Sequence, residues 1–220
     1  MATHTIKMFI KFGQEEHMRD LFFNGTIYMN PIQYFRELED NELRGDIYEG
    51  ISKIRNYPAG QFEIPSLNYK GNYLKLQIRQ SYETVLGNIC SFYCVSSYGW
   101  DDPTTFRIDE KNKRFGSHCV VIKDNMRFLS LIKQKLKEQK VRFKHGFVDY
   151  YDKDKVDREI HLFEKPLEFE YQKEFRFYVE RVSADSFKFS IGSLESIAEL
   201  HKSNDIIDTL KLVVNKNKTL

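Results

Sequence analysis

The stretch Phe169–Val179 reads FEYQKEFRFYV, and the expected fold follows from it. Successive side chains of an extended chain point to opposite faces. Glu170, Gln172, Glu174 and Arg176 would therefore share one face, while the opposite face would be mainly aromatic. Such a strand packs on its aromatic side, and its polar side either faces solvent or builds a site. We predict a strand over residues 169–180.

The composition indicates a single folded domain. The chain has 220 residues, of which 41% are hydrophobic and 15% aromatic, enough for one sizeable core. The 18 Phe and 13 Tyr favour a sheet-rich fold, because flat rings fit a pleated, half-buried surface. We expect one domain over residues 1–220.

The charge balance argues against a dedicated nucleic-acid binder. The 34 basic and 32 acidic residues give a net charge of +2, far from the strong basic excess of that class. One basic cluster lies between Lys133 and Lys144. A solvated helix face is the ordinary interpretation of such a cluster.

The three cysteines indicate a reducing compartment. Cys90, Cys94 and Cys119 lie in apolar runs without CxxC spacing, as expected of reduced core thiols. The six histidines show no pairing at ligand spacing, so we expect no metal site. No N-terminal targeting segment and no apolar run near the roughly 18 residues of a membrane span is present. We expect a soluble, cytoplasmic protein without a membrane partner.

Hydrophobic periodicity and turn signals predict an α+β fold with a split, mainly antiparallel β-sheet and peripheral helices. Asp124 is expected to cap a helix with Met126, Leu129, Ile132 and Leu136 as its buried stripe. The strand at 187–191 is expected to pair with the strand at 169–180. The predicted strands are 5–12, 26–29, 51–57, 73–79, 88–97, 117–122, 146–151, 169–180, 187–191 and 206–214. The predicted helices are 14–24, one that begins at Asn30-Pro31 and runs to about 38, 124–139, and a short one from 193.

Glu174 is the first candidate for a catalytic group. A carboxylate fixed on a rigid strand is well placed to stabilise positive charge that develops in a transition state. Aromatic residues flank it, which argues that this face is not fully exposed. The alternative is an ordinary surface strand with polar residues.

A second polar cluster occupies residues 35–50. Gly45 and Gly50 bracket an Asp and a Glu there, and glycine permits a close backbone approach. One interpretation is a solvated helix end and loop. The other is a substrate-facing loop in which Arg36 or Arg44 meets an anion such as a pyrophosphate.

Several known motifs are absent. The chain has no GxGxxG after a strand, no GxxxxGK[ST], no HExxH and no GxSxG, so Rossmann, P-loop, zinc-protease and serine-hydrolase chemistry lack support. Lys11 and Phe12 end the first predicted strand just before Gly13, where Lys11 would place a cation at a sheet edge.

The order of these features resembles the ADP-ribosyltransferase superfamily. A first strand ends in Lys11, and the segment 25–31 (GTIYMNP) follows a helix. A buried strand ends at Ser96, and a late strand carries QKEFR at 172–176. The resemblance covers roughly residues 5–195 and is greatest to a bacterial and phage family with a late Q/E-x-E-F/W-R strand motif.

The resemblance implies a split sheet that grips NAD in a cleft. Carried over by position, Lys11 takes the basic place on the first strand and Ser96, or else Ser91 or Ser97, takes the serine place. Glu174 is then the catalytic carboxylate, and Gln172 helps to position the acceptor.

Other residues are expected to hold parts of the NAD molecule. Phe12, Tyr28 or Tyr34 would stack on the nicotinamide or adenine ring. Arg36 or Arg44 would hold the pyrophosphate.

The expected function is transfer of ADP-ribose from NAD to a nucleic acid or protein, or hydrolysis of NAD. By analogy with the superfamily, such a small enzyme would be a toxin or a phage-defence effector with an antitoxin or regulatory partner. One alternative is a catalytically silent binding module on the same split sheet. Another is a divalent-metal nuclease that uses Asp46, Glu49 and Glu174.

Overall fold

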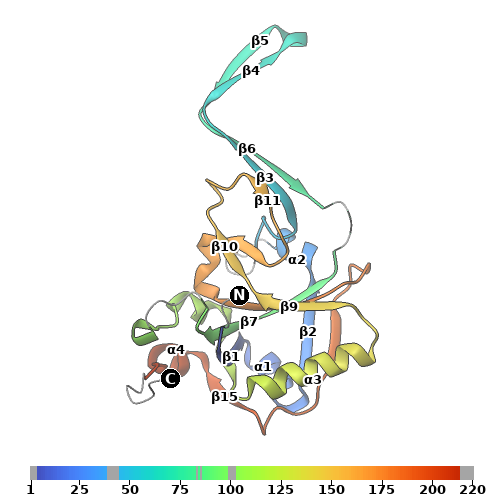
Figure 1. Ribbon diagram of the computed structural model, residues 1–220, viewed down its shortest axis with the longest axis vertical. Helices are drawn as coiled ribbons and strands as arrows, with labels where there is room; N and C mark the ends of the chain where they lie inside the picture. The colour runs from blue at the N-terminus through green and yellow to red at the C-terminus, as the bar shows by residue number, and fades with distance from the viewer. Residues whose placement is uncertain (1–3, 39–44, 83, 85, 99–102, 214–220) are drawn as a thin grey trace.

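The computed structural model describes residues 4–38, 45–82, 84, 86–98 and 103–213. It shows an α+β protein whose sheets are mostly antiparallel and whose few helices lie around them, so the predicted class is confirmed (Figure 1). A long hairpin projects from this body at one end.

The strand β7 (Asn88–Ser96) is the centre of the main sheet. Eight of its nine residues are buried, because the run NICSFYCVS is apolar on both faces near its middle. One edge of β7 pairs antiparallel with β13 (Glu174–Val179), and β13 in turn pairs with β9 (Phe143–Phe147). This half of the sheet is continuous along residues 88–93 of β7.

The other edge of β7 is shared between two strands, and the sheet divides there. β1 (Ile6–Gly13) pairs with residues 93–96 of β7, while β2 (Thr26–Pro31) pairs only with residues 88 and 89. Neither strand pairs with residues 90–92, so β1 and β2 diverge and leave a gap at mid-strand. β8 (His118–Ile122) and β15 (Ala198–Lys202) continue the sheet beyond β1.

The helices cover both faces of this sheet. α1 (Glu15–Asn24) and α3 (Asn125–Glu138) bury apolar side chains against the face that carries the phenylalanines of β7 and β13. α4 (Ser203–Thr209) packs with the side chains of the opposite face. The sheet is therefore the middle layer, and the short α2 (Ile32–Glu37) follows β2.

The projecting hairpin has a base and a tip. Its base is β3 (Ile51–Tyr57) paired with β6 (Leu76–Ser81), and β11 (Arg158–Glu159) joins the edge of β3. Its tip is β4 (Gly60–Ile64) paired with β5 (Tyr69–Tyr73). Figure 1 shows the tip far from the sheet.

Short elements connect the rest of the chain. β10 (Asp149–Tyr151) and β12 (Glu164–Pro166) form a small parallel pair beside β13. The remaining short elements are 3₁₀ turns: η1 (Pro65–Leu67), η2 (Pro103–Thr105), η3 (Glu110–Phe115) and η4 (Leu167–Gln172).

The predicted strand at 169–180 is wrong in its first third. Residues 167–172 form η4, and Lys173 has a left-handed backbone with φ 39°, so the strand starts only at Glu174. Glu170 and Gln172 therefore do not share a strand face with Glu174. The hairpin partner was also wrong, because Phe187–Ser190 (β14) pairs with β2 and not with β13.

The C-terminal predictions were reversed. The residues predicted as a helix from 193 include β15, which completes the edge of β8, and the predicted strand at 206–214 contains most of α4. Sheet pairing outweighed the helical spacing of the apolar residues in the first case.

Other local predictions have mixed outcomes. Asp124 caps α3 as predicted, accepting from Arg127 N–H, but Met126 is 73% exposed, and Phe128 belongs to the buried stripe in its place. Asn30 is not a helix cap, since β2 extends through Pro31 before α2 begins. The strand predicted at 73–79 corresponds to β6, which begins only at Leu76, while Tyr73 is the last residue of β5. The sequence Trp100-Asp101-Asp102-Pro103 predicts a turn, and this stretch lies largely outside the described residues.

Candidate functional site

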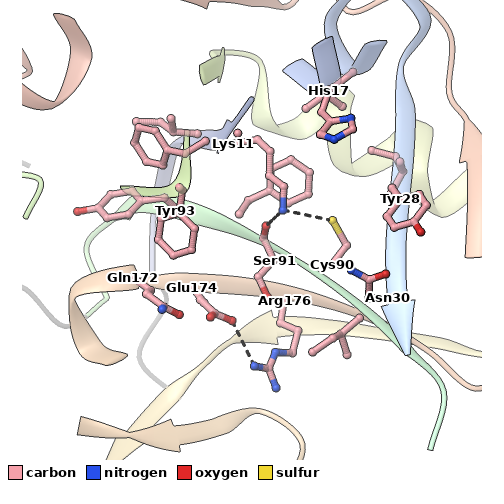
Figure 2. Close-up of a pocket in the computed structure, with 18 of the residues that line it drawn as sticks. Lys11, His17, Tyr28, Asn30, Cys90, Ser91, Tyr93, Gln172, Glu174 and Arg176 are labelled. Atoms are coloured by element: carbon pink, nitrogen blue, oxygen red, sulfur yellow. Dashed lines mark hydrogen bonds and ion pairs between the residues drawn. The ribbon is translucent and has the colours of Figure 1, made fainter. Parts of the chain in front are cut away.

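A cavity of about 560 Å³ opens where β1 and β2 diverge from β7 (Figure 2). Its walls come from elements that are distant in sequence: β1, α1, β2, β7, β12 and β13. Figure 2 shows the labelled side chains converging on this space from several strands. The lining includes Lys11, Phe12, His17, Tyr28, Asn30, Tyr34, Cys90, Ser91, Tyr93, Lys165, Gln172, Glu174 and Arg176.

The main chain of Glu174 is fixed on both sides. Its N–H donates to the Tyr150 hydroxyl at 2.9 Å, and its carbonyl accepts from Val148 N–H at 3.0 Å. The residue lies at the first position of β13, directly opposite Tyr93 of β7. Its carboxylate is only 8% exposed and lines the cavity.

Two cations and a hydroxyl hold the carboxylate of Glu174. Lys165 Nζ donates to Oε1 at 2.8 Å, and Arg176 Nη2 donates to Oε2 at 3.2 Å. The Ser91 hydroxyl also hydrogen-bonds this carboxylate. Burial alone would raise the pKa of Glu174, but the charges of Lys165 and Arg176 lower it to about 2. Glu174 is therefore ionised at every physiological pH.

Arg176 links this carboxylate to the base of the hairpin. Its guanidinium binds both oxygens of Glu49 at 2.8 and 3.0 Å and also donates to the Leu162 carbonyl. Burial lowers the pKa of Arg176, but the carboxylates of Glu49 and Glu174 outweigh that effect and raise it above its usual range. Arg176 is 1% exposed, so its bidentate ion pair with Glu49 is shielded from water, and charge-assisted hydrogen bonds of this geometry are stronger than neutral ones.

Asp46 is a further buried carboxyl in the same cluster. Its Oδ1 accepts from Tyr48 N–H at 2.8 Å, whereas its Oδ2 is buried without a hydrogen-bond partner. Burial raises the pKa of Asp46 to about 6, with Lys165 opposing and Glu49 adding to the shift. This group titrates close to neutral pH.

Lys11 reaches from β1 into the gap between β1 and β2, where residues 90–92 of β7 have neither strand as a partner. Its ammonium donates to the Ser91 carbonyl at 2.7 Å, contacts Cys90 Sγ at 3.8 Å and lies 5.3 Å from the centre of the Phe92 ring. Within the described part of the chain it forms no ion pair with a carboxylate. A partly buried ammonium without a counter-ion, at the wall of a cavity, suits an anionic ligand group.

Aromatic and polar side chains complete the cavity. Tyr28 is 52% exposed and Phe12 9% exposed, so one ring lies at the rim and the other deeper. Burial raises the pKa of Tyr93 above its usual range, so its phenol stays protonated. Asn30 and His17 add an amide and an imidazole ring to the wall.

Gln172 joins Glu174 by a route that the sequence did not indicate. The two side chains do not share a strand, yet Gln172 Oε1 accepts from Lys165 Nζ at 2.9 Å, the ammonium that also binds Glu174. Gln172 Nε2 donates to the Tyr171 hydroxyl at 3.2 Å. Lys165 therefore brings together the two residues predicted as catalytic.

The other predicted residues divide into two groups. Lys11, Phe12, Tyr28 and Tyr34 line the cavity, whereas Ser96 does not. Ser96 lies at the far end of β7 opposite Ile6, and its hydroxyl accepts from Tyr98 N–H, so the serine at the site is Ser91.

The predicted pyrophosphate residues are not in the cavity. Arg36 donates to the Ser81 hydroxyl at 3.0 Å and lines a separate hollow beside the hairpin base. Arg44 lies outside the described residues.

Lys165 and Tyr150 are site residues that sequence reasoning missed. Both lie on the small parallel pair β10–β12, whose strands have three residues each, too few to show a periodicity. A lone Lys before a Pro carries no signal of burial. Only the three-dimensional packing shows it.

The carboxylates proposed for a nuclease do come together, but around side-chain cations. Asp46, Glu49 and Glu174 surround Lys165 and Arg176, whose positive charges lie where a divalent ion would have to bind. Among the described residues no group of three His, Cys, Asp or Glu is arranged to hold a metal. This cluster is therefore a salt-bridge network.

The comparisons with known proteins found no match to any family model, curated protein or solved structure. Across the described residues, no helix has the length and apolar character needed to cross a membrane. The three cysteines are free thiols buried in the core.

Proposed function

We propose that the chain is an NAD-dependent ADP-ribosyltransferase whose site is the cavity at the division of the sheet. One observation carries the proposal: Glu174 is an ionised carboxylate, fixed on a rigid strand, at the wall of a cavity large enough for a small-molecule ligand. The reaction needs such a group because cleavage of the nicotinamide–ribose bond makes a ribosyl cation.

The role of Glu174 follows from charge. As the bond between C1′ and the nicotinamide nitrogen breaks, its electron pair leaves with nicotinamide, and positive charge develops on C1′ and the ring oxygen. A carboxylate that accepts a hydrogen bond from a ribose hydroxyl stabilises this state more than the ground state. The acceptor then attacks C1′ and loses its proton to solvent or to a nearby base.

Lys11 and the aromatic residues account for binding. The Lys11 ammonium has no carboxylate partner within the described residues and is free to meet a phosphate oxygen. Tyr28 at the rim and Phe12 deeper offer rings on which a nicotinamide or adenine base stacks. Gln172, held by Lys165 beside Glu174, would position the acceptor.

The acceptor is a macromolecule, nucleic acid or protein, or else water. Basic residues on α3 (Lys133, Lys137), on the segment that follows it (Lys140, Arg142) and on β9 (Lys144) provide a surface for a polyanion. A role as a toxin or phage-defence effector, in the cytoplasm and with a regulatory partner, rests on the resemblance to the superfamily alone.

A catalytically silent binding module is the second candidate. It is favoured by the engagement of Glu174, both of whose oxygens already accept hydrogen bonds from cations. A carboxylate has about four acceptor positions, so a ribose hydroxyl still has room to bind. The difference between the two candidates is turnover.

The test is incubation of the protein with NAD labelled in the adenine ring, together with RNA, DNA and a protein extract. We expect wild type to release nicotinamide and to label one acceptor class, and Glu174→Gln to lose at least about 100-fold in rate, the usual effect of removing one charge-stabilising group. Glu170→Gln is the matched control, because Glu170 is an exposed carboxylate on η4 and pairs only with Lys173 among the described residues.

A second variant covers the case in which Glu174→Gln does not fold. Tyr28→Ala removes a half-exposed ring at the cavity rim, so the variant should fold and have a higher KM for NAD than wild type. Tyr82→Ala removes a similarly exposed ring outside the cavity and should leave the KM for NAD unchanged. Binding of NAD without any release of nicotinamide would favour the silent module. Cleavage of nucleic acid that EDTA stops, with no need for NAD, would overturn the proposal.

A further inference from the structure

The tip of the hairpin, residues 60–73, is an amphipathic two-stranded sheet, and none of its residues belongs to a hydrophobic core cluster of the described part of the chain. Cross-strand pairing puts Ile64 opposite Tyr69, and Gln61 opposite Asn72. Side chains alternate along a strand, so Phe62, Ile64, Tyr69 and Tyr73 share one face, whereas the other face is polar. No residue between 57 and 76 is buried.

The aromatic side chains of the apolar face pack against glycines and against one another. A Cβ on Gly71 would lie 2.5 Å from the Phe62 ring, and a Cβ on Gly60 would lie 2.5 Å from the Tyr73 hydroxyl oxygen. The rings of Phe62 and Tyr69 also contact each other, with centroids 5.9 Å apart. Phe62 and Tyr69 are nevertheless 42% and 53% exposed, and Leu67 at the turn is 72% exposed.

An isolated two-stranded hairpin is only marginally stable in water, and such hairpins usually become stable when a further strand or a packed element covers their apolar face. The base of the hairpin has such a packed element, because Ile54 packs with Tyr151, Val156 and Ile160 of the body. The tip has none among the described residues. It therefore needs a partner from outside the chain.

Charge decides the kind of partner. The tip holds one acidic and one basic residue, Glu63 and Lys70, which pair at 2.6 Å on the polar face, so its net charge is zero. Three of the four basic residues in the rest of the hairpin are also engaged: Arg55 pairs with Asp157, Lys75 pairs with Asp154, and Arg79 lies over the Tyr48 ring. Nucleic acid and anionic lipid require unpaired cations, which the tip does not offer.

We propose that the tip binds the tip of a second copy of this chain, with the two apolar faces packed together. An uncharged, aromatic face is self-complementary, and two copies meet there without like-charge repulsion. The packed tips would form a small two-layer sheet with Phe62, Ile64, Tyr69 and Tyr73 of both copies between the layers.

The area available sets the strength of this contact. Four partly exposed side chains, each with a total surface of at most about 250 Å², offer well below the roughly 800 Å² per partner of a standard interface. The dimer should therefore be weak, and the average mass of the protein in solution should rise with concentration.

The experiment is sedimentation equilibrium of the full chain over a range of concentrations. We expect a monomer–dimer equilibrium in wild type and a monomer for the double variant Ile64→Lys/Tyr69→Lys. Gln61→Lys/Asn72→Lys is the matched control: it adds the same charge at a cross-strand pair on the same hairpin, but on the polar face, and it should still dimerise.

The remaining outcomes also decide the proposal. Equal melting temperatures of the two double variants would show that both fold, as expected of positions without core contacts. Wild type that stays monomeric at all concentrations overturns the proposal, as does equal loss of dimer in both variants. Cosedimentation of monomeric wild type with neutral phosphatidylcholine vesicles, lost only in Ile64→Lys/Tyr69→Lys, would assign the face to lipid instead.

Discussion

Lys165 is the residue on which the site geometry depends most. Its ammonium is buried, binds Glu174 and Gln172 at once and lies over the Phe169 ring. Burial lowers the pKa of Lys165, but Glu174, Asp46 and Glu49 outweigh that effect and raise it, so the group stays charged. A buried charge pair of this kind specifies a geometry more than it stabilises the fold.

Lys165→Met should therefore be strongly destabilising. It leaves the Glu174 carboxylate with only Arg176 as its cation, and loss of one partner of a buried pair costs about 3–5 kcal/mol. Urea unfolding at pH 7 measures the loss. Lys155→Met, which removes a surface ion pair with Asp152, is the control and should change little. Equal effects of the two variants would contradict the network described here.

Asp46 predicts a pH dependence of the opposite sign to that of Glu174. Its pKa is raised from 3.8 to about 6, so between these values the folded protein keeps a proton that the unfolded chain has released. Stability from this group therefore falls as pH rises from about 4 to 6 and then levels off. For Glu174, whose pKa is lowered from 4.5 to about 2, stability is present above 4.5 and is lost as pH falls toward 2.

Asp46→Asn should remove the first of these dependences. The variant should gain stability relative to wild type as pH rises, by at most on the order of 3 kcal/mol above pH 6. The amide keeps the acceptor for Tyr48 N–H, so the turn is preserved. Unfolding free energies at pH 4, 5, 6 and 7 measure this, with the surface variant Asp154→Asn as control. A pH-independent difference would contradict the assignment.

At the scale of elements, the strand β2 is placed by a glycine. Gly25 ends α1 with φ 61°, and a Cβ there would lie 1.9 Å from the Gly192 carbonyl oxygen, next to the β2–β14 pair. The backbones approach this closely because β14 pairs along β2, which forms one side of the gap.

Gly25→Ala should cost several times more stability than Gly192→Ala. Both residues have a positive φ, which costs an Ala about 1–2 kcal/mol. At Gly192, however, φ is 83° and no atom lies within 4 Å of the added Cβ, so only the conformational cost applies. Urea unfolding of both variants measures the difference. A similar loss in both would mean that the close approach at Gly25 does not restrict the fold.

Helices and strands were predictable from the sequence where the residues of the element itself show an apolar pattern or a cap. The strands at 51–57 and 88–97, the helix at 124–139 and the glycine stop at Gly25 were predicted to within about a residue at each end, because each has its own apolar pattern or cap. Prediction from the sequence failed at 167–172, where an aromatic run with alternating polarity forms η4. It failed again at the C-terminus, where the free edge of β8 recruits residues 198–202 as a strand.

The candidate site was predictable only in part. Glu174 and Lys11 could be predicted because each lies in a strand-like stretch with a polar pattern of its own, and both line the cavity. Lys165 and Tyr150 act through contacts between segments that are far apart in sequence, whereas Ser91 was predicted only as an alternative to Ser96. No local pattern encodes such contacts. Arg36 shows the opposite error, because its charge alone led to the prediction that it holds a pyrophosphate, whereas it lies outside the cavity.

At the scale of the whole molecule, one network joins the cavity to the hairpin. Glu174 binds Arg176, Arg176 binds Glu49, and Glu49 lies two residues before β3, the first strand of the hairpin. The base of the hairpin is therefore fixed to the same strand that carries the catalytic candidate. Its tip remains free to meet a partner (Figure 1).

The central claim is that the cavity at the division of the sheet binds NAD with its ribose at Glu174. The most direct measurement is a crystal structure of the protein with a non-cleavable NAD analogue. We predict the nicotinamide ribose in the gap between β1 and β2, with a hydroxyl within hydrogen-bond distance of the Glu174 carboxylate and a phosphate beside Lys11. An analogue bound elsewhere, or an empty cavity at saturating analogue, would contradict the account.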